Sequence, residues 1–420
     1  MKKVLRSIVV KILWWQVGRL QRAHQFSVIG VAGSVGKTST KVAVASVLST
    51  QFKVAWQEGN YNDVVSIPLV FFGQPMPSLL NPIAWIRLFV RNETSIRQYD
   101  KQIVVVELGT DHAGDMAQLK GRLTTDVTIL TAITPEHMAG FDSLDDVAAE
   151  ELIAAEIAKH VVADSDSIPE QYLSKISNPT TIGMKAGDCI IDPGELHMTG
   201  RAVRLQFEGE EVEFTTPLLG KHNLPAPAFA FVVARQQGIE TGRIQSELQK
   251  LRAFPGRMNT LPGKHGALLI DDTYNSSPDA ATAALDTLYE LQTTRRIAVL
   301  GQMNELGKFS EAFHTELGEH CNPDMLELVL TIGEDANKYT ASAAEAKGCK
   351  VIQCASPYQA AAEIEPLLSK ETVVLIKGSQ NGVFAEETTK QLLANKADTA
   401  QLVRQSDHWL RVKQQQFKDS

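Results

Sequence analysis

A glycine-rich turn followed at once by lysine and threonine is the strongest chemical signal in the chain. It comes after residues 26–32, an apolar run typical of a buried strand, and before the helical stretch 40–48. The turn reads Gly33-Ser34-Val35-Gly36-Lys37-Thr38-Ser39. Backbone N–H groups of such a loop close on phosphates, the lysine pairs with the β- and γ-phosphates, and the threonine is a Mg²⁺ ligand. The segment therefore predicts a site for a nucleoside triphosphate.

The spacing within this loop is shorter than in the common phosphate-binding pattern. The residue five positions before Gly36 is Val31, so the loop reads GxxGKT instead of GxxxxGKT. A glycine-rich turn that precedes a helix by chance is the alternative, and the Lys-Thr pair at the helix start argues against it. We expect a triphosphate loop of a less common kind.

Two more polar residues stand where expected strands end. Glu107 closes the apolar run 103–106, and His137 follows the apolar run 127–132 and the turn at Pro135. Open α/β sheets bind their ligands at the carboxyl ends of strands, and a carboxylate there suits Mg²⁺. By residue type alone, Glu107 is equally a helix cap, and a lone histidine is more often a hydrogen-bonded structural residue.

Length and composition indicate a protein of two or three domains. The chain has 420 residues, of which 44% are hydrophobic, enough for a large core. Its net charge of −8 provides no general attraction for DNA or RNA, so nucleic acid is not an expected partner. The cysteines show no CxxC spacing and are expected to be reduced core residues of a cytosolic protein; they are Cys189, Cys321, Cys349 and Cys354.

The first 25 residues contain six lysines and arginines and no acidic residue. Their apolar stretch, which includes Trp14-Trp15, is interrupted by Lys11, is too short to span a bilayer and lacks a small-residue cleavage site. No signal peptide is expected. Two alternatives stay open: a basic amphipathic helix in the membrane interface beside anionic lipids, or a helix that docks on its own domain.

The rest of the chain alternates between short strand-like runs and helical lengths, which predicts an α/β fold with mostly parallel sheets. The expected strands are 26–32, 52–56, 103–108 and 127–132, then short strands within 189–216, and after Pro255-Gly256 the runs 267–271, 297–300, 326–332, 350–354 and 372–376. We expect an N-terminal helix (1–26), a central P-loop ATPase domain (27–256), a C-terminal Rossmann-like domain (257–400) and a polar tail (401–420), either a surface helix or frayed.

The short loop and eleven further segments in the same order resemble the Mur ligase superfamily. Within it the resemblance is greatest to the MurF branch, whose members join D-alanyl-D-alanine to a UDP-muramoyl tripeptide. The matching segments are 39–41, 59–63, 67–68, 107–115, 135–137, 140–144, 220–223, 255–257, 271–278, 300–307 and 377–379. Together they cover the chain from about residue 27 to about residue 392.

This resemblance implies a reaction in which ATP phosphorylates a carboxylate and an amine then attacks the acyl phosphate to form an amide. Lys37 and Mg²⁺ would stabilise the charge on the transferred phosphoryl group. The resemblance assigns Glu107 and His137 to Mg²⁺, Asp272 to the nucleotide, Arg257 to the phosphates as an arginine between domains, and His222 and Asn223 to the adenine. By residue type alone, Asn223 is equally a helix cap.

The resemblance also assigns residues to the amino acceptor and its cleft. Lys377 and Ser379, which follow the apolar run 372–376, match the acceptor-side Lys-Gly-Ser of the family. The remaining substrate-side residues in the matching segments are Asn60, Asn62, His112, Tyr274, Asn275 and Pro278.

Several positions depart from the family pattern. Glu151 stands where Mur ligases carry a carbamoylated lysine, and we hypothesise that its carboxylate supplies the anion that the carbamate would supply. The alternative is that Glu151 lies on a solvated helix face. Ala226 replaces a second asparagine, while Gln302 and Gln380 replace the usual Asp and Arg, which puts the identity of the acceptor in doubt.

Only about 26 residues precede the first strand, whereas MurF proteins have a domain there that binds the UDP-sugar. We expect that another chain supplies this binding or that the acyl substrate is recognised differently, for example at a membrane surface. Three functions stay open: a MurF-like ligase acting on a cell-wall precursor, a related ligase of the folate or glutamate-polymer type, and a non-catalytic ATP-binding regulator. The expected location is the cytoplasm, with residues 1–25 free to contact the inner face of the membrane or a partner chain.

Overall fold

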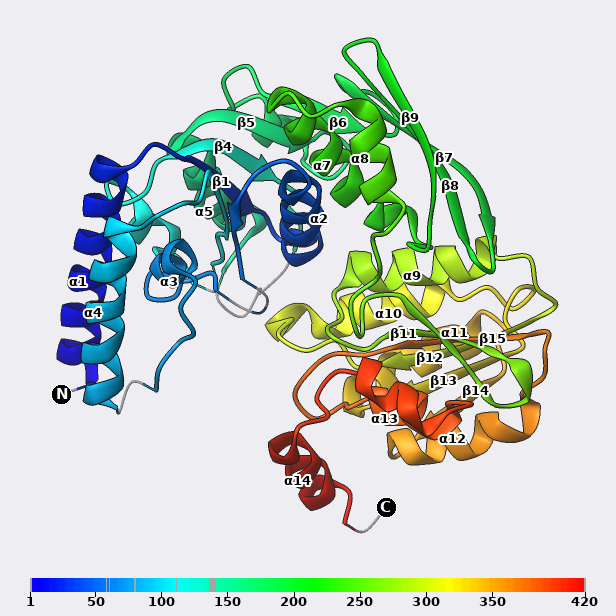
Figure 1. The fold of residues 1–420 in the computed structure, drawn as a ribbon. Helices are drawn as coiled ribbons and strands as arrows, with labels where there is room; N and C mark the ends of the chain where they lie inside the picture. Colours follow the sequence, from blue (N-terminus) through cyan, green and yellow to red (C-terminus); the bar gives the residue numbers. More distant parts are fainter. Residues whose placement is uncertain are drawn as a thin grey trace. The chain divides into compact units, whose positions relative to one another are not determined.

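The computed structural model describes residues 2–57, 59, 61–78, 81–110, 112–135 and 141–418, without the side chains of residues 2–4. The chain divides into two compact units (Figure 1). Unit 1 comprises Met1–Pro193, Val203–Phe214 and Asn223–Lys250, and unit 2 comprises Gly194–Ala202, Thr215–His222 and Leu251–Ser420. The α/β fold class is confirmed by the two sheets and their helices, whereas the domain limits proposed from sequence stay a prediction.

The larger sheet has the strand order β2-β3-β1-β4-β5-β6-β7-β8-β9. Its strands are β1 (Ser27–Ala32), β2 (Val54–Ala55), β3 (Ile103–Glu107), β4 (Thr125–Leu130), β5 (Ala158–Asp164), β6 (Thr180–Gly183), β7 (Cys189–His197), β8 (Gly200–Phe207) and β9 (Glu210–Thr216). Neighbours from β2 to β7 pair in parallel. The central strands β1, β3 and β4 are buried along almost their whole length, as expected for a sheet covered on both faces, whereas burial in β8 alternates from residue to residue.

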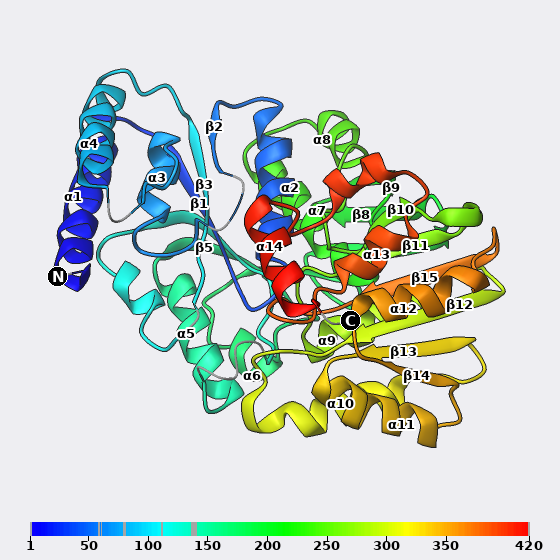
Figure 2. The same cartoon turned by 90° about the horizontal axis from the view of Figure 1, so that it is seen from below.

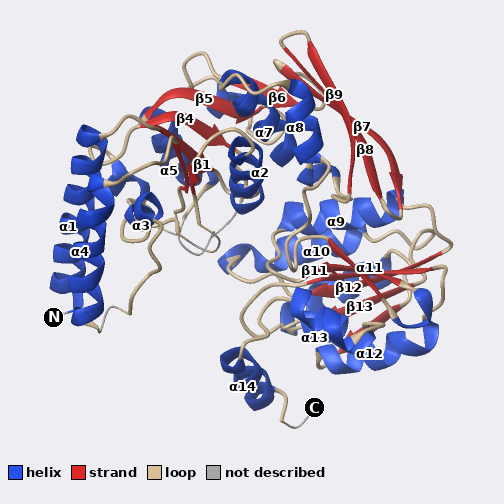
Figure 3. Ribbon diagram, in the orientation of Figure 1, coloured by secondary structure: helices blue, strands red, loops and turns tan. Residues whose placement is uncertain are grey.

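Some helices of unit 1 pack directly on this sheet, and others pack on those helices (Figure 3). The helices of unit 1 are α1 (Lys2–Ala23), α2 (Lys37–Ser49), α3 (Ile67–Phe72), α4 (Pro82–Arg97), α5 (Leu144–Glu156), α6 (Glu170–Leu173), α7 (Pro225–Gln236) and α8 (Thr241–Leu248), with short 3-10 turns at Met116–Leu119 and Lys221–Asn223. α2, which begins at the glycine-rich loop, packs along α7. The helix that follows the loop is therefore packed between α7 and the strands β1 and β3.

The N-terminal helix α1 docks on its own unit, one of the two alternatives left open by the sequence. Leu13, Val17 and Leu20 are fully buried against the core that α3 and α4 share. The indole N–H of Trp14 donates to the Val64 carbonyl over 2.8 Å. No helix in the described part of the chain has the length and apolar character needed to cross a membrane.

Unit 2 is a six-stranded sheet with helices on both faces (Figure 2). The order β10-β11-β15-β12-β13-β14 comprises β10 (Asn259–Pro262), β11 (Leu268–Asp272), β15 (Thr372–Lys377), β12 (Arg295–Gly301), β13 (Leu328–Ile332) and β14 (Val351–Cys354), all parallel except β10. Its helices are α9 (Pro278–Glu290), α10 (Ser310–His320), α11 (Ala341–Ala346), α12 (Pro357–Ile364), α13 (Glu386–Leu392) and α14 (Asp407–Gln416). Shorter turns lie at Lys264–Gly266, Gly307–Phe309, Ala336–Thr340, Glu365–Leu367 and Lys396–Gln401.

Alternate residues of the unit 2 strands fill two separate apolar cores, as expected for a sheet covered on both faces. Ile270, Ala298 and Leu375 face the side of α9 and α10, while Leu269 and Ile376 face the side of α12 and α13. All four cysteines are free thiols and buried, as expected for core residues.

Candidate active site

The glycine-rich loop is held in a conformation that its two glycines make accessible. Gly33 has φ 120° and Gly36 has φ 84°, both in the region that side chains rarely adopt. A Cβ at Gly33 would lie 2.4 Å from the hydroxyl of Thr131. That hydroxyl donates to the Val35 carbonyl over 2.6 Å, so the loop is fastened to the residue that follows β4. The conformation of the loop is thus stabilised by Thr131, a residue almost a hundred positions away.

Lys37 opens α2, and its ammonium curls back over the loop. Its Nζ donates to the carbonyl of Gly33 and, over 2.8 Å, to that of Ser34. The hydroxyl of Ser34 is turned inward and accepts the N–H of Thr134 over 3.1 Å, and Ser39 lies half-buried in the first turn of α2. Among the residues that the structure describes, Lys37 is held by neutral carbonyls, so a phosphate can compete for it at low cost.

Thr38 and Glu107 meet at the end of β3, as the sequence predicts for a metal site. The Thr38 hydroxyl lies 3.2 Å and 3.3 Å from the two carboxylate oxygens of Glu107. Glu107 is 3% exposed and forms an ion pair of 2.9 Å with Lys41, which is equally buried. Lys41 also donates to the Gly59 carbonyl over 3.0 Å. A hydroxyl and a carboxylate are oxygen donors that suit Mg²⁺, with an ammonium beside them.

Glu151 lies inside the protein beside the glycine-rich loop. It is 1% exposed on α5, and one of its carboxylate oxygens accepts the backbone N–H of Gly33 over 2.8 Å. Its neighbour Glu150 is 6% exposed and accepts the N–H of Gly114 over 2.9 Å. The alternative of a solvated helix face is therefore wrong for Glu151, because α5 turns this side chain towards the loop.

Two of the predicted site residues, Asn60 and His137, lie outside the described residues. Asn62 packs its side-chain amide against Gly109, just after β3, and its carbonyl accepts the Gly109 N–H over 3.0 Å. The side chain of His112 is 78% exposed and lies 3.9 Å from the Asp115 carboxylate. Among the residues that the structure describes, no three His, Cys, Asp or Glu side chains come close enough to hold a metal ion.

In unit 2, Asp272 and Lys377 end two adjacent parallel strands and pair directly. They are partners in the register of β11 and β15, and Nζ lies 3.0 Å from Oδ2. Asp272 also accepts the N–H of Met258 over 3.1 Å. Burial lowers the pKa of Lys377, and the Asp272 carboxylate works against this shift. The sequence predicted both residues for the site, and the structure brings them together.

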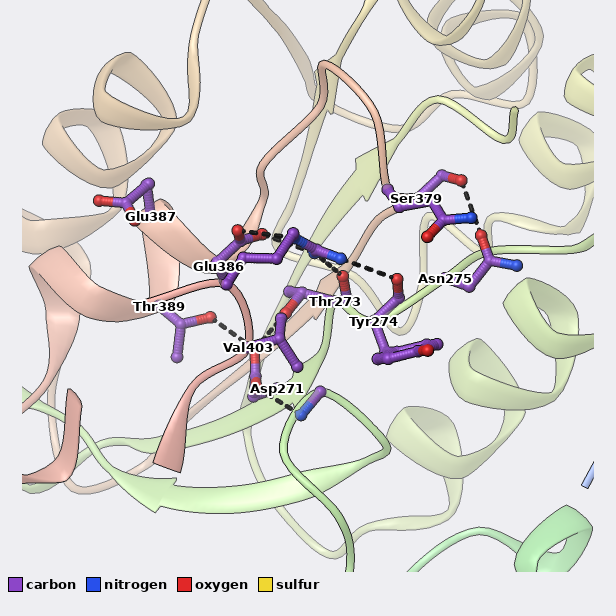
Figure 4. Close-up of polar contacts among 12 residues, drawn as sticks. Asp271, Thr273, Tyr274, Asn275, Ser379, Glu386, Glu387, Thr389 and Val403 are labelled. Carbon is purple, nitrogen blue, oxygen red and sulfur yellow. Dashed lines mark hydrogen bonds and ion pairs between the residues drawn. The ribbon is translucent and has the colours of Figure 1, made fainter. Parts of the chain in front are cut away.

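The loop after β11 carries the other predicted acceptor-side residues. Lys377 donates to the Asn275 carbonyl over 2.6 Å, and the Ser379 hydroxyl donates to the Asn275 side chain over 2.8 Å (Figure 4). The guanidinium of Arg257 lies over the ring of Tyr274, 4.2 Å from its centre. Pro278 begins α9 directly after this loop. Three side chains from two separate segments, Arg257 and the pair Lys377 and Ser379, therefore contact the loop that carries Tyr274 and Asn275.

Asp271 is a fully buried carboxylate beneath this loop. It accepts hydroxyl hydrogen bonds from Thr273 and Thr389, and the N–H of Gly256 over 2.9 Å (Figure 4). Burial raises its pKa to about 7, and these hydrogen bonds oppose the rise only in part. Because Gly256 precedes Arg257, Asp271 fixes the backbone that presents the arginine.

The polar tail forms a helix, and part of it is buried. Arg404 makes a bidentate ion pair with Glu386, and its guanidinium donates to the carbonyls of Thr273 and Tyr274. Lys413 on α14 is 2% exposed and pairs with Glu386 and Glu387 over 2.8 Å and 2.7 Å. The tail is therefore bound to the loop that carries Tyr274.

His222 and Asn223 lie in the 3-10 turn that leads into α7. The His222 ring packs on Gly220 and is exposed. The side-chain nitrogen of Asn223 is buried without a hydrogen-bond partner among the described residues. A buried donor of this kind fits a ligand that presents an acceptor, such as a nucleotide base. Ala226, in the first turn of α7, adds no polar group.

Gln302, which departs from the family pattern, belongs to a hydrogen-bond network that reaches the backbone of Gln380, the second such glutamine. Gln302 accepts the N–H of Asp335 over 3.0 Å and donates to the side chain of Asn304 over 3.1 Å. Asn304 in turn donates to the carbonyls of Gln380 and Asn381. The segment that follows Ser379 is thereby tied to the end of β12.

Sequence reasoning missed four residues of these clusters: Lys41, Thr131, Asp271 and Arg404. For Lys41 a signal existed, because it lies four residues after Lys37 and shares a face of α2 with it. The others had no local signal, since each contacts partners that are distant in sequence.

Comparisons with known proteins match both units. The profile of the Mur ligase middle domain matches residues 31–234, and that of the Mur ligase glutamate ligase domain matches residues 256–380. The UDP-N-acetylmuramoyl-tripeptide–D-alanyl-D-alanine ligase of Escherichia coli (strain K12) is 26% identical over 381 residues, 88% of this chain and 77% of that enzyme. The enzyme of the same name from Bacillus subtilis (strain 168) is 27% identical over 313 residues, 73% of this chain and 63% of that enzyme.

A solved structure extends the likeness to the fold. The MurF ligase of Thermotoga maritima in complex with ADP superimposes with a TM-score of 0.74 at 24% identity, over 92% of this chain and 83% of that one. The order of the motifs, the two profile matches and the shared fold all agree with the resemblance read from the sequence. The chain belongs to the Mur ligase family of ATP-dependent amide ligases.

Proposed function

We propose that this chain is a peptide ligase of the MurF type. It phosphorylates the carboxylate of a cell-wall precursor with ATP and joins the acyl phosphate to D-alanyl-D-alanine or a similar amine. The observation that carries the proposal is the set formed by the glycine-rich loop, Lys37 and the Thr38–Glu107 contact, in a chain with both Mur ligase domains.

The residues of unit 1 would act on the phosphates. The loop leads directly into the start of α2, where the helix dipole adds positive potential. Lys37 would exchange its two carbonyl partners for phosphate oxygens, and charge-assisted bonds of this kind are stronger than those to carbonyls. Transfer of the phosphoryl group is thereby supported by a cation that, among the described residues, bonds to carbonyl oxygens.

The oxygen donors Thr38 and Glu107 fit Mg²⁺, and we propose that they hold it together with His137. When bound, Mg²⁺ would neutralise charge on the transferred phosphoryl group. Glu151 would supply the anion that a carbamoylated lysine supplies elsewhere in the family, from a carboxylate that Gly33 already orients. Lys41 holds the Glu107 carboxylate in place through the 2.9 Å ion pair.

The residues of unit 2 would hold the amino acceptor and the nucleotide. We assign Lys377, Ser379, Asn275 and Pro278 to the acceptor side and Asp272 to the nucleotide. Arg257, stacked on Tyr274, would present its guanidinium to phosphate with the ring fixing its plane. The remaining substrate-side assignments, Asn60, Asn62 and His112, and the adenine assignments, His222 and Asn223, are part of the same proposal.

Two alternative functions would differ from this one in the amine that is used or in the turnover of ATP. A ligase of the folate or glutamate-polymer type uses the same chemistry with another amine, and a regulator binds ATP without turnover. The intact set of Lys37, Thr38, Glu107 and Asp272 favours turnover. We further propose that the reaction takes place in the cytoplasm at the inner face of the membrane, on small-molecule substrates and without nucleic acid.

Phosphate release measured with paired carboxylates and amines separates these functions. We expect release with a UDP-muramoyl tripeptide and D-alanyl-D-alanine, and an amide product that mass spectrometry detects. Release only with glutamate or another amine would establish the second function. ATP binding without release for any pair would overturn the proposal in favour of the third.

A further inference from the structure

The exposed apolar side chains of this protein gather on two helices. Among the described residues, eight large hydrophobic side chains are exposed, and six of them lie on α1 and α4. These six are Leu5, Ile8, Trp15, Ile83, Ile86 and Val90, and the three on α4 are each more than 60% exposed. Single exposed hydrophobic residues are ordinary, whereas a concentration of this kind indicates an interaction surface.

α1 and α4 lie side by side in unit 1 and run in the same direction (Figures 1 and 2). Gln16 near the middle of α1 donates to the Phe89 carbonyl over 2.9 Å, and His24 just after α1 contacts the Ile96 carbonyl over 2.6 Å. The buried amide of Asn92 donates to Gln16 over 2.9 Å. These contacts hold the two helices together.

The exposed residues of each helix follow helical spacing and therefore share a face. Ile8 and Trp15 are seven residues apart on α1, and Ile83, Ile86 and Val90 are three and four apart on α4. Both helices bury their opposite sides in the same apolar core. The six side chains consequently point to the same side of the pair, which we call the α1–α4 face.

The two helices are basic in an acidic protein. They carry nine lysines and arginines against one glutamate, whereas the whole chain has 41 Lys and Arg against 49 Asp and Glu. The basic residues are Lys2, Lys3, Arg6, Lys11, Arg19 and Arg22 on α1, and Arg87, Arg91 and Arg97 on α4. The one acidic residue, Glu93, forms an ion pair with Arg19. The excess charge of the pair is therefore positive.

Trp15 is 56% exposed, and the guanidinium of Arg19 lies 4.8 Å from the centre of its ring. Tryptophan and arginine together are typical of the headgroup region of a bilayer, where an amphipathic ring and a long cationic side chain both find partners. We propose that the α1–α4 face binds the surface of an anionic phospholipid bilayer. The six apolar side chains enter the interface, and the basic residues contact headgroup phosphates. This binding does not depend on the ligase reaction.

Co-sedimentation of the full chain with vesicles tests the proposal. We expect binding to phosphatidylcholine vesicles that contain phosphatidylglycerol, much weaker binding to pure phosphatidylcholine, and release by salt. Arg87→Gln/Arg91→Gln should weaken binding on the order of thirtyfold, because each cation near an anionic surface contributes about fivefold to tenfold. Ile83→Ser/Ile86→Ser/Val90→Ser should weaken it as well, since the apolar contact is lost.

A matched control removes the same charge elsewhere. Lys185→Gln/Lys347→Gln neutralises two exposed lysines far along the chain and should leave vesicle binding unchanged. Thermal unfolding and ATP-dependent phosphate release in the absence of vesicles should be the same for all these variants. Equal binding to both kinds of vesicle, or equal loss in the control, would overturn the proposal. So would an absence of vesicle binding with self-association that the triple serine variant abolishes, because the face would then join two copies of the chain.

Discussion

Each unit of this protein contains one buried lysine–carboxylate pair at the carboxyl end of a parallel strand, and the two pairs are built differently. In unit 1, Glu107 ends β3 and reaches Lys41 on a helix, over 2.9 Å. In unit 2, Asp272 and Lys377 both end strands and meet in register over 3.0 Å. The first pair stands beside the glycine-rich loop, which we propose binds phosphate, and the second beside the loop to which we assign the amino acceptor. The same type of interaction, a buried lysine–carboxylate pair, thus stands beside two different loops.

The difference lies in what each lysine does besides pairing. Besides its ion pair, Lys41 donates a hydrogen bond to the backbone carbonyl of Gly59. Lys377 donates instead to the carbonyl of Asn275, whose side chain also accepts a hydrogen bond from Ser379. Loss of Lys41 should therefore act mainly on stability. Loss of Lys377 should act on stability and on the acceptor.

Breaking either pair should give the largest effect on folding. We expect Lys41→Met and Lys377→Met each to lower the free energy of unfolding by about 3–5 kcal/mol, because a buried carboxylate loses its cation. Chemical denaturation measures this loss. Glu107→Gln/Lys41→Met should recover part of the stability, as should Asp272→Asn/Lys377→Met. If the single variants unfold like the wild type, the pairs are not buried as described.

The two carboxylates that end β11 sharpen the comparison within unit 2, because Asp272 has a cation and Asp271 has hydroxyl and N–H donors but no ion pair among the described residues. Burial raises the pKa of Asp271 from 3.8 to about 7. The folded state then holds a proton that the unfolded state releases between about pH 4 and pH 7. Stability from this group is present below pH 4 and is lost as the pH rises through 7.

We expect the free energy of unfolding of the wild type to fall across this window, relative to Asp271→Asn, by at most about 4 kcal/mol. Denaturation curves of both proteins at several pH values give the difference. Thr389→Val removes one hydrogen bond to the carboxylate and should raise the pKa further. Parallel pH profiles of wild type and Asp271→Asn would contradict the prediction.

The site residues differ in how far the sequence could predict them. Lys37 and Thr38 follow the glycines directly, so their position depends on local backbone geometry that the motif fixes. The expected strands of unit 2 were confirmed because long apolar runs between helical lengths leave few alternatives. Arg404 could not be predicted in this way, because its role depends on contacts with Glu386 and Thr273. A contact between the tail and a loop far away in the sequence leaves no local sequence pattern.

Lys37 tests whether a lysine that donates to backbone carbonyls contributes less to stability than Lys41 and Lys377, which form buried ion pairs. Lys37→Met should lower phosphate release by about 10²–10³-fold, the cost of removing one stabilising donor from a site of developing charge. Its unfolding free energy should change little, because the partners of Lys37 in the described part of the chain are two carbonyls. Lys53→Met, on an exposed lysine, is the control. A loss of stability as large as that of Lys41→Met would show that Lys37 is structural.

Glu151 tests the proposed exchange of a carbamoylated lysine for a glutamate. Glu151→Gln keeps the size of the side chain and an oxygen that can accept the Gly33 N–H, but it removes the charge. We expect turnover to fall by about 10–100-fold, with a higher Mg²⁺ requirement, the usual cost of losing an anion near a metal site. Glu150→Gln is the matched control on the same helix, because that carboxylate binds Gly114 and Met116 instead.

Glu151→Lys makes the sharper test, because it restores the residue type of the family. Carbamoylation of this lysine would need CO₂, so turnover of Glu151→Lys should rise when bicarbonate is added, while turnover of the wild type should not. Phosphate release in buffers freed of CO₂ and then supplemented with bicarbonate measures both. If bicarbonate stimulates neither protein and Glu151→Gln turns over at the wild-type rate, Glu151 serves only to hold Gly33.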